Sequence, residues 1–169
     1  MTRTLLLVRH AKAGHGDESS DAKRSLTELG YEQCRILGRE LCSLKLEPDV
    51  ALVSTARRAR QTYNALAAAA SWDLDATLVE PLYTGYVPEV LDAVHTVPDS
   101  ATVAMVVGHE PTMSAAAYSL ASTGSDPDTV TRVRRGMPTA GMAVIQVDGP
   151  WESVGFEPTL LRWLLTPLA

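Results

Sequence analysis

The sequence places two histidines and two arginines at or near the ends of short apolar runs, namely Arg9, His10, Arg58 and His109. A neutral imidazole can attack a phosphoryl dianion without charge repulsion, and an arginine fork binds phosphoryl oxygens through two hydrogen bonds. Because phosphoryl transfer spreads negative charge over the equatorial oxygens, fixed cations stabilise its transition state. These residue types predict a phosphoryl-transfer site with His10 as the nucleophile. The developing charge would be held by Arg9, Arg58 and protonated His109.

The apolar runs themselves predict strands that position these polar groups. They span 4–8, 50–53 and 102–107, and a polar group follows each of them. In open α/β sheets ligands bind at the carboxyl ends of the strands, so we expect the three polar groups to share one pocket. A helix is expected to start near Ala56, and its positive end would face the same anion.

The rest of the chain alternates between helical and strand-like patterns. Apolar residues at three- and four-residue steps predict a helix to about Lys45, and Ser25 with Glu28 matches a capping-box spacing at its start. Ser54 or Thr55 could cap a further helix through about Ala70, and other helices are expected over 88–95 and after 111. Further strands are expected over 77–79, 142–147 and 159–165. This order predicts one α/β domain over residues 1–169, a three-layer sandwich whose mostly parallel central sheet has helices on both faces.

Residues 123–139 differ from this pattern. They are rich in Gly, Ser, Asp, Pro and Thr, which are residue types typical of turns and loops. We therefore predict a long surface connection without a packing pattern of its own.

Composition and charge argue against several classes of protein. A net charge of −5 lacks the broad excess of Lys and Arg that binding to nucleic acid or acidic lipid needs, so neither partner is expected. No apolar run approaches membrane-spanning length, and strand-like residues begin by Thr4, which leaves no room for a leader. Cys34 and Cys42 fall on one predicted helix with a rise of roughly 12 Å between them, beyond disulfide reach. Two free thiols favour a location in the reducing cytoplasm.

Metal and nucleotide sites have less support in the sequence. Near His10 stand three further potential metal ligands, His15, Asp17 and Glu18. Their spacing matches no tight ligand pattern, and Arg9 would oppose a bound cation. The nearby glycines also lack the phosphate-loop spacing to Lys and Ser or Thr. We therefore expect neither a metal ion nor a cofactor.

Three fragments resemble the motifs of the histidine phosphatase superfamily. They are Leu7-Val8-Arg9-His10-Ala11, Ser54-x-x-x-Arg58-Ala59-x-Gln61-Thr62 and Val107-Gly108-His109-Glu110-Pro111. Three others are similar to the SixA-type phosphohistidine phosphatase branch: Lys12-Ala13, Arg24-Ser25-Leu26-Thr27-x-x-Gly30 and Leu82-Tyr83. The resemblance covers about residues 4–120 and implies a phosphoglycerate mutase-like fold.

The same resemblance implies roles for individual residues. His10 would become phosphohistidine, with Arg9, Arg58 and His109 around the phosphoryl group. Arg24 would lie near the entrance and bind substrate. Arg58 is preferred to its neighbours Arg57 and Arg60 because it alone lies four residues after Ser54 and immediately before Ala59. Those two neighbours are expected to be exposed.

The family pattern also bears on the substrate. Larger family members carry an acidic proton donor in a helical insertion that this chain is too short to contain, and Glu80, the nearest acidic candidate, is not assigned that role. Phosphohistidine has an imidazole leaving group that can leave already protonated, which reduces the need for an acid. We expect a metal-independent phosphohydrolase that acts on phosphohistidine of a signalling protein. Two alternatives stay open, a phosphatase of small phosphorylated metabolites with the same fold and a non-hydrolytic phosphocarrier or phosphate-binding module.

Overall fold

The computed structural model describes residues 1–15 and 18–167 of the chain, which are built around one six-stranded sheet. In spatial order the strands are β3 (Thr77–Leu78), β2 (Val50–Val53), β4 (Val103–Gly108), β1 (Arg3–Arg9), β5 (Met142–Val147) and β6 (Leu160–Leu165). β3, β2, β4 and β1 pair in parallel, whereas β5 runs antiparallel to both β1 and β6. The predicted, mostly parallel sheet is confirmed.

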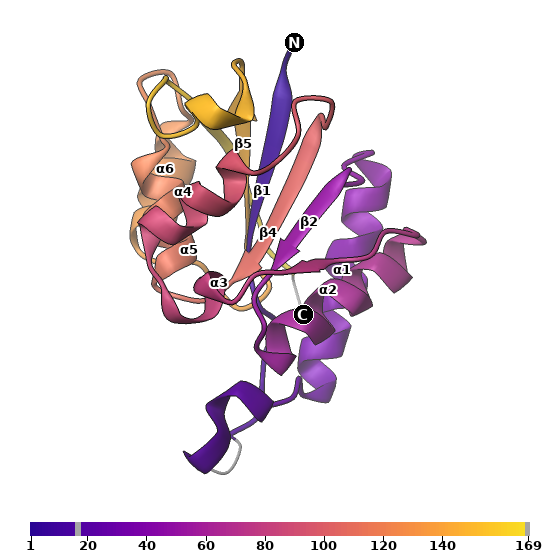
Figure 1. Ribbon diagram of the computed structural model, residues 1–169. Coiled ribbons are helices and arrows are strands. Elements are labelled where there is room, and N and C mark those ends of the chain that lie inside the picture. Colours follow the sequence, from indigo (N-terminus) through magenta and orange to yellow (C-terminus); the bar gives the residue numbers. More distant parts are fainter. Residues whose placement is uncertain (16–17, 168–169) are drawn as a thin grey trace.

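Helices cover both faces of this sheet (Figure 1). On one face lie α1 (Glu28–Ser43) and α2 (Arg57–Ala70), and on the other lie α4 (Val87–His95), α5 (Thr112–Ser119) and α6 (Pro127–Arg134). Shorter helical segments are η1 (Glu18–Lys23), α3 (Pro81–Thr84) and η2 (Trp151–Ser153). The expected three-layer sandwich is confirmed. Among the helices described, none is both long and apolar enough to cross a bilayer.

The central strand β1 shows why its sequence is continuously apolar. Leu5 and Leu7 pack into the core beneath α4 and α5, while Leu6 and Val8 pack into the core beneath α1 and α2. All four are fully buried. Successive side chains of a strand point to opposite faces, so a strand covered on both sides has no position for a polar residue until it ends.

The capping residues of two helices differ from the predictions. Thr27, and not Ser25, caps α1, because its hydroxyl accepts a hydrogen bond from the backbone N–H of Gly30. The helix expected to be capped by Ser54 or Thr55 begins at Arg57, and its N-cap residue Ala56 offers no side-chain cap. The first turn of α2 therefore keeps backbone N–H groups that no side chain caps.

The prediction for residues 123–139 was wrong, because this segment contains α6. The Asp126 carboxylate accepts a hydrogen bond from the backbone N–H of Thr129, and Pro127 occupies the first turn, where proline is well tolerated. Val133 is fully buried in the core beneath α5. A helix of two turns that buries so few apolar side chains leaves too short a periodic pattern to detect in the sequence.

Candidate active site

The carboxyl ends of β1, β2 and β4 bring the predicted polar residues together. Arg9 pairs in register with Gly108, and the backbone N–H of His10 donates to the Gly108 carbonyl at 3.0 Å. The next residue, His109, then lies beside His10, with 5.3 Å between their ring centroids. The common edge of the parallel strands produces this meeting, as the sequence pattern predicts.

The Nε2 atom of His10 carries no proton. Its Nδ1 lies 2.7 Å from the Ala11 carbonyl oxygen, and because a carbonyl only accepts, Nδ1 holds the proton. Nε2 accepts a hydrogen bond from Arg58 Nε at 3.3 Å. Burial and the charges of Arg58, Arg9 and Arg24 together lower the pKa of His10 to about 4, although the hydrogen bond to the Ala11 carbonyl acts to raise it. The ring, 9% exposed, is therefore neutral at pH 7, as a nucleophile requires.

The hydroxyl of Thr62 fixes the backbone beside His10. It accepts a hydrogen bond from the Ala11 N–H at 2.9 Å and donates one to the Arg58 carbonyl at 2.7 Å, which joins the end of β1 to α2. One residue earlier, Gln61 Oε1 accepts from the Leu26 N–H at 2.8 Å. Two polar residues of the second motif thus hold the loops around the site.

Arg58 projects toward His10 from the first turn of α2. It is 6% exposed, whereas Arg57 and Arg60 are exposed, as predicted. Its Nε contacts His10, and its Nη1 and Nη2 donate to the backbone carbonyl and the carboxylate of Asp21 at 2.9 and 3.1 Å. The guanidinium therefore spans from the imidazole to the mouth of the pocket, a geometry suited to holding an anion beside His10.

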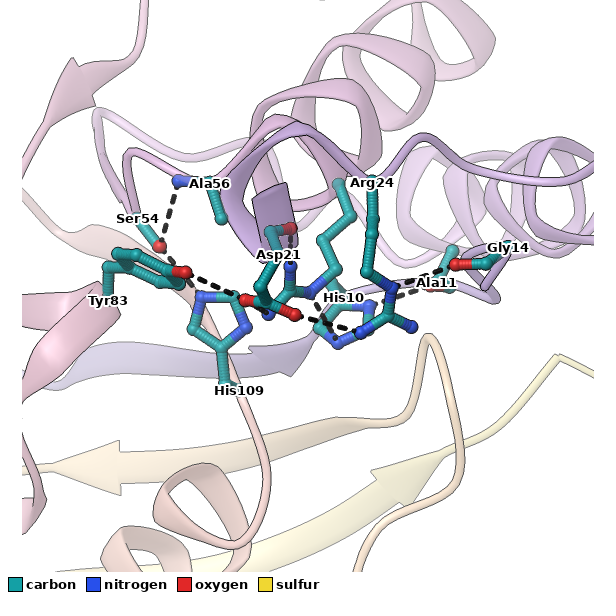
Figure 2. Close-up of polar contacts among 10 residues, drawn as sticks. His10, Ala11, Gly14, Asp21, Arg24, Ser54, Ala56, Tyr83 and His109 are labelled. Carbon is teal, nitrogen blue, oxygen red and sulfur yellow. Dashed lines mark hydrogen bonds and ion pairs between the residues drawn. The ribbon is translucent and has the colours of Figure 1, made fainter. Parts of the chain in front are cut away.

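His109 is fixed by Ser54, for which the sequence suggested only a helix cap. The Ser54 hydroxyl accepts from the Ala56 N–H at 3.3 Å and lies 2.7 Å from His109 Nε2, so its own proton is available for that nitrogen. In the tautomer in which Ser54 donates to Nε2, the imidazole proton lies on Nδ1, a buried atom without a partner among the described residues. Figure 2 shows this ring beside His10.

The charge of His109 differs from the expectation of a protonated ring. Burial, together with the nearby charge of Arg58, lowers its pKa to about 3, so the ring is neutral at pH 7. The Nδ1–H group can still donate a hydrogen bond to an anion. A bound dianion would also favour the protonated form.

The side chain of Arg9, the residue before His10, is hydrogen-bonded to a distant part of the chain. Its Nη1 donates to the Met137 carbonyl at 2.9 Å, and its Nε is buried without a partner in the described structure. The Met137 N–H in turn donates to the Glu110 carboxylate at 3.1 Å, which also accepts from the backbone N–H of Ser114. The glutamate of the third motif thus supports the segment that holds Arg9. The charge of Arg9 reaches His10, whose pKa it helps to lower.

An acidic residue that the sequence analysis missed lies at the exposed edge of this group of side chains. Asp21 in η1 accepts hydrogen bonds from Arg24 Nη1 at 3.1 Å, Arg58 Nη2 at 3.1 Å and the Tyr83 hydroxyl at 2.7 Å (Figure 2). Arg24, predicted near the entrance, also donates from Nε to the Gly14 carbonyl at 2.8 Å. The sequence held one signal for this group, since Arg24 and Tyr83 both fall in fragments of the SixA-type resemblance.

Other candidates from the sequence lie apart from this group. His15 and Glu80 are exposed, and His95 Nε2 bonds to the Val154 carbonyl at 2.8 Å elsewhere in the fold. Of the acidic residues considered as metal ligands, Asp17 lies outside the described residues. Within the described ranges, no group of three or more His, Cys, Asp and Glu side chains could hold a metal ion.

Comparisons with known proteins agree with the motifs. The family model "Histidine phosphatase superfamily (branch 1)" matches residues 5–86. An uncharacterized protein of Mycobacterium tuberculosis is 38% identical over 148 residues, 87% of this chain and 91% of that protein.

Two solved structures match nearly the whole chain. A protein of Nakamurella multipartitia, provisionally assigned as the phosphohistidine phosphatase SixA, is 31% identical with a TM-score of 0.86 and covers 100% of this chain and 98% of its own. An Agrobacterium tumefaciens protein with the same provisional assignment is 28% identical with a TM-score of 0.80, and the match covers 98% of each chain. The chain therefore belongs to the histidine phosphatase superfamily, is of the SixA type within it, and is a phosphatase.

Proposed function

We propose that the chain hydrolyses phosphoryl compounds in two steps through a covalent phosphohistidine at His10. The observation that carries this proposal is the buried, unprotonated Nε2 of His10, which has the Arg58 guanidinium on it and the His109 ring beside it. A nucleophile next to fixed donors is the arrangement that covalent phosphoryl transfer requires.

In the first step, His10 Nε2 forms a bond to phosphorus while the bond from phosphorus to the leaving group breaks. The Ala11 carbonyl keeps the proton on Nδ1, so Nε2 attacks as a neutral base. Arg58 and the Nδ1–H of His109 donate to the phosphoryl oxygens, and Arg9 adds positive charge behind them.

In the second step, water attacks the phosphorus of phosphohistidine, the His10 Nε2–phosphorus bond breaks and inorganic phosphate leaves. The same donors hold the oxygens, because the charge distribution of this transition state matches that of the first. The arginines supply the positive charge at the phosphoryl group, so we propose a reaction independent of metal ions.

The proposed substrate is phosphohistidine on a signalling protein. Support comes from the likeness to the protein of Nakamurella multipartitia, which is provisionally assigned as a phosphohistidine phosphatase. The chemistry of the leaving group adds to it, because an imidazole that leaves with its proton already in place needs no strong acid from the enzyme. No partnership with nucleic acid or membrane is proposed. Cys34 and Cys42 are free thiols, which supports a cytoplasmic location.

The direct test is steady-state turnover in the presence of a chelator. We expect the wild type to release phosphate, and His10→Ala to lose about 10⁴-fold or more of kcat, because the nucleophile is gone. His95→Gln is the matched control, since His95 lies outside the pocket and the amide can keep the bond to the Val154 carbonyl. Undiminished turnover by His10→Ala would rule out the covalent mechanism, and loss of wild-type activity in chelator would rule out metal independence.

The two alternatives are separated by substrate and by product. A phosphatase of small phosphorylated metabolites would prefer one compound in a panel of phosphomonoesters over a phosphohistidine protein by a large ratio of kcat/KM. A phosphocarrier would retain a stable, transferable phosphoryl group on His10 and release little inorganic phosphate. The presence of both Arg58 and His109 at the nucleophile favours turnover over storage.

A further inference from the structure

The carboxylate of Asp21 is an anion at the exposed edge of a group of side chains whose other charges, on Arg9, Arg24 and Arg58, are positive. Its Oδ2 accepts from Arg58 and Tyr83, and its Oδ1 accepts from Arg24 (Figure 2). The hydrogen bond from Tyr83, with those from both arginines, lowers the pKa of Asp21 to about 2, so the group is ionised at neutral pH. A negative charge here repels an incoming phosphoryl group.

The position of Asp21 relative to His10 points to the leaving-group side of the reaction. Arg58 lies between the two, with Nε on His10 and Nη2 on the Asp21 carboxylate. In phosphoryl transfer the attacking and leaving atoms lie roughly in line with phosphorus. A phosphoryl group bound by Arg58 and attacked by His10 would thus direct its leaving group away from His10, toward the half-exposed Asp21.

We propose that Asp21 is a specificity-determining residue whose carboxylate accepts a hydrogen bond from the ring N–H of the leaving imidazole of phosphohistidine. This inference rests on the proposed function. When the His10 Nε2–phosphorus bond forms, the phosphorus–nitrogen bond of the substrate breaks and its electron pair stays on the leaving nitrogen. In the imidazolium form of the bound substrate the other ring nitrogen carries a proton, so neutral imidazole departs and no acid has to supply a proton.

The carboxylate favours this route because it stabilises the imidazolium form of the bound substrate. A phosphoester has no such N–H group, and its leaving oxygen gains negative charge close to Asp21. The same carboxylate that assists phosphohistidine therefore opposes phosphoesters. Asp21 thereby selects between substrates, and it does so without acting as a proton donor.

The experiment compares kcat/KM of wild type, Asp21→Asn and Asp21→Glu on a phosphohistidine protein and on p-nitrophenyl phosphate. We expect Asp21→Asn to lose about 10- to 100-fold on phosphohistidine, the value of a hydrogen bond to a charged group. Its rate on the aryl phosphate should stay unchanged or rise. Asp21→Glu, which keeps the charge, should recover part of the loss. Glu80→Gln is the control, because Glu80 is exposed and near in sequence to Tyr83.

A pH profile adds a second readout. Without the carboxylate, the imidazolium of bound phosphohistidine loses its proton more readily, so the alkaline limb of kcat should move to lower pH in Asp21→Asn. An equal loss on both substrates, with the limb unmoved, would mean that Asp21 only holds Arg58 and would overturn the inference while the proposed function stands. A wild type that hydrolyses the aryl phosphate but not phosphohistidine would overturn the proposed substrate and the inference with it.

Discussion

The buried residues around His10, called the floor below, and the exposed segment that carries Asp21, called the arm, hold their functional groups in different ways. The floor is built from strand ends and the first turns of a helix. Its groups are held by hydrogen bonds to backbone and side-chain groups of neighbouring elements. It comprises Ser54, Thr62, Arg58, His10 and His109. The arm is η1 with Arg24 after it, and it extends from the body of the fold (Figure 1). Its Asp21 and Arg24 side chains are 48% and 27% exposed.

This difference separates two tasks. Groups buried against a sheet edge keep a fixed position at no cost during the reaction, which suits stabilisation of the phosphoryl charge. Groups on an exposed arm are bonded mainly to one another and to Arg58, which suits contact with the varied part of a substrate. We therefore expect changes in the floor to affect all substrates alike and changes in the arm to affect them unequally.

The largest effect should come from Arg58→Lys. A lysine cannot reproduce the planar guanidinium that contacts both His10 and Asp21, so we expect kcat/KM to fall about 10²- to 10³-fold. The fall should be similar for phosphohistidine and for p-nitrophenyl phosphate, because the phosphoryl group is common to both. Arg57→Lys, on the exposed side of the same helical turn, is the control. A fall confined to one substrate would contradict the assignment of Arg58 to the floor.

Thr62→Val tests the difference between floor and arm through its effect on the free energy of unfolding. The buried Ala11 N–H would lose its acceptor, which costs about 1–3 kcal/mol in the free energy of unfolding. Thermal or denaturant unfolding measures this loss, and Thr62→Ser, which keeps the hydroxyl, should retain most of the stability. Asp21→Asn should cost less, up to about 1 kcal/mol, because the Asp21 side chain is 48% exposed and its ion pairs are screened by solvent. Equal losses in the two variants would show that floor and arm are not distinct.

A third comparison is the dependence of stability on pH. The pKa values of His10 and His109 are about 4 and 3 in the folded protein, against about 6.5 in the unfolded chain. Between these values the unfolded chain binds more protons, so stability falls as pH decreases from about 6.5 toward 4. The lowered pKa of Asp21 acts only below pH 4.

Unfolding midpoints at pH 7 and pH 4.5 therefore distinguish the two regions. His10→Asn should show a smaller decrease than the wild type over this interval, while Asp21→Asn should show the same decrease as the wild type. A wild-type midpoint that does not decrease between these pH values would contradict the neutral, buried histidines of the floor.

The same division explains what could be predicted from the sequence. The floor follows from the strand pattern, since a polar residue after a doubly buried strand such as β1 lies at the sheet edge by necessity. Arg58 could be selected only through the resemblance to the family's second motif, in which it lies four residues after Ser54. The arm could not be predicted in this way, because Asp21 meets Tyr83 across 62 positions of the chain through side chains alone. The bonds of Thr62 and Ser54 were missed for a related reason, as a hydroxyl serves a cap, a turn or a tertiary contact equally well.

Covalent phosphorylation of His10 is tested most directly by rapid quenching of the wild type with a ³²P-phosphohistidine protein. The quench should be alkaline, because the phosphorus–nitrogen bond of phosphohistidine is labile in acid. We predict that label appears on residue 10 within a single turnover and passes to inorganic phosphate, and that His10→Ala acquires none. Phosphate release without labelled enzyme, or equal labelling of His10→Ala, would contradict the account.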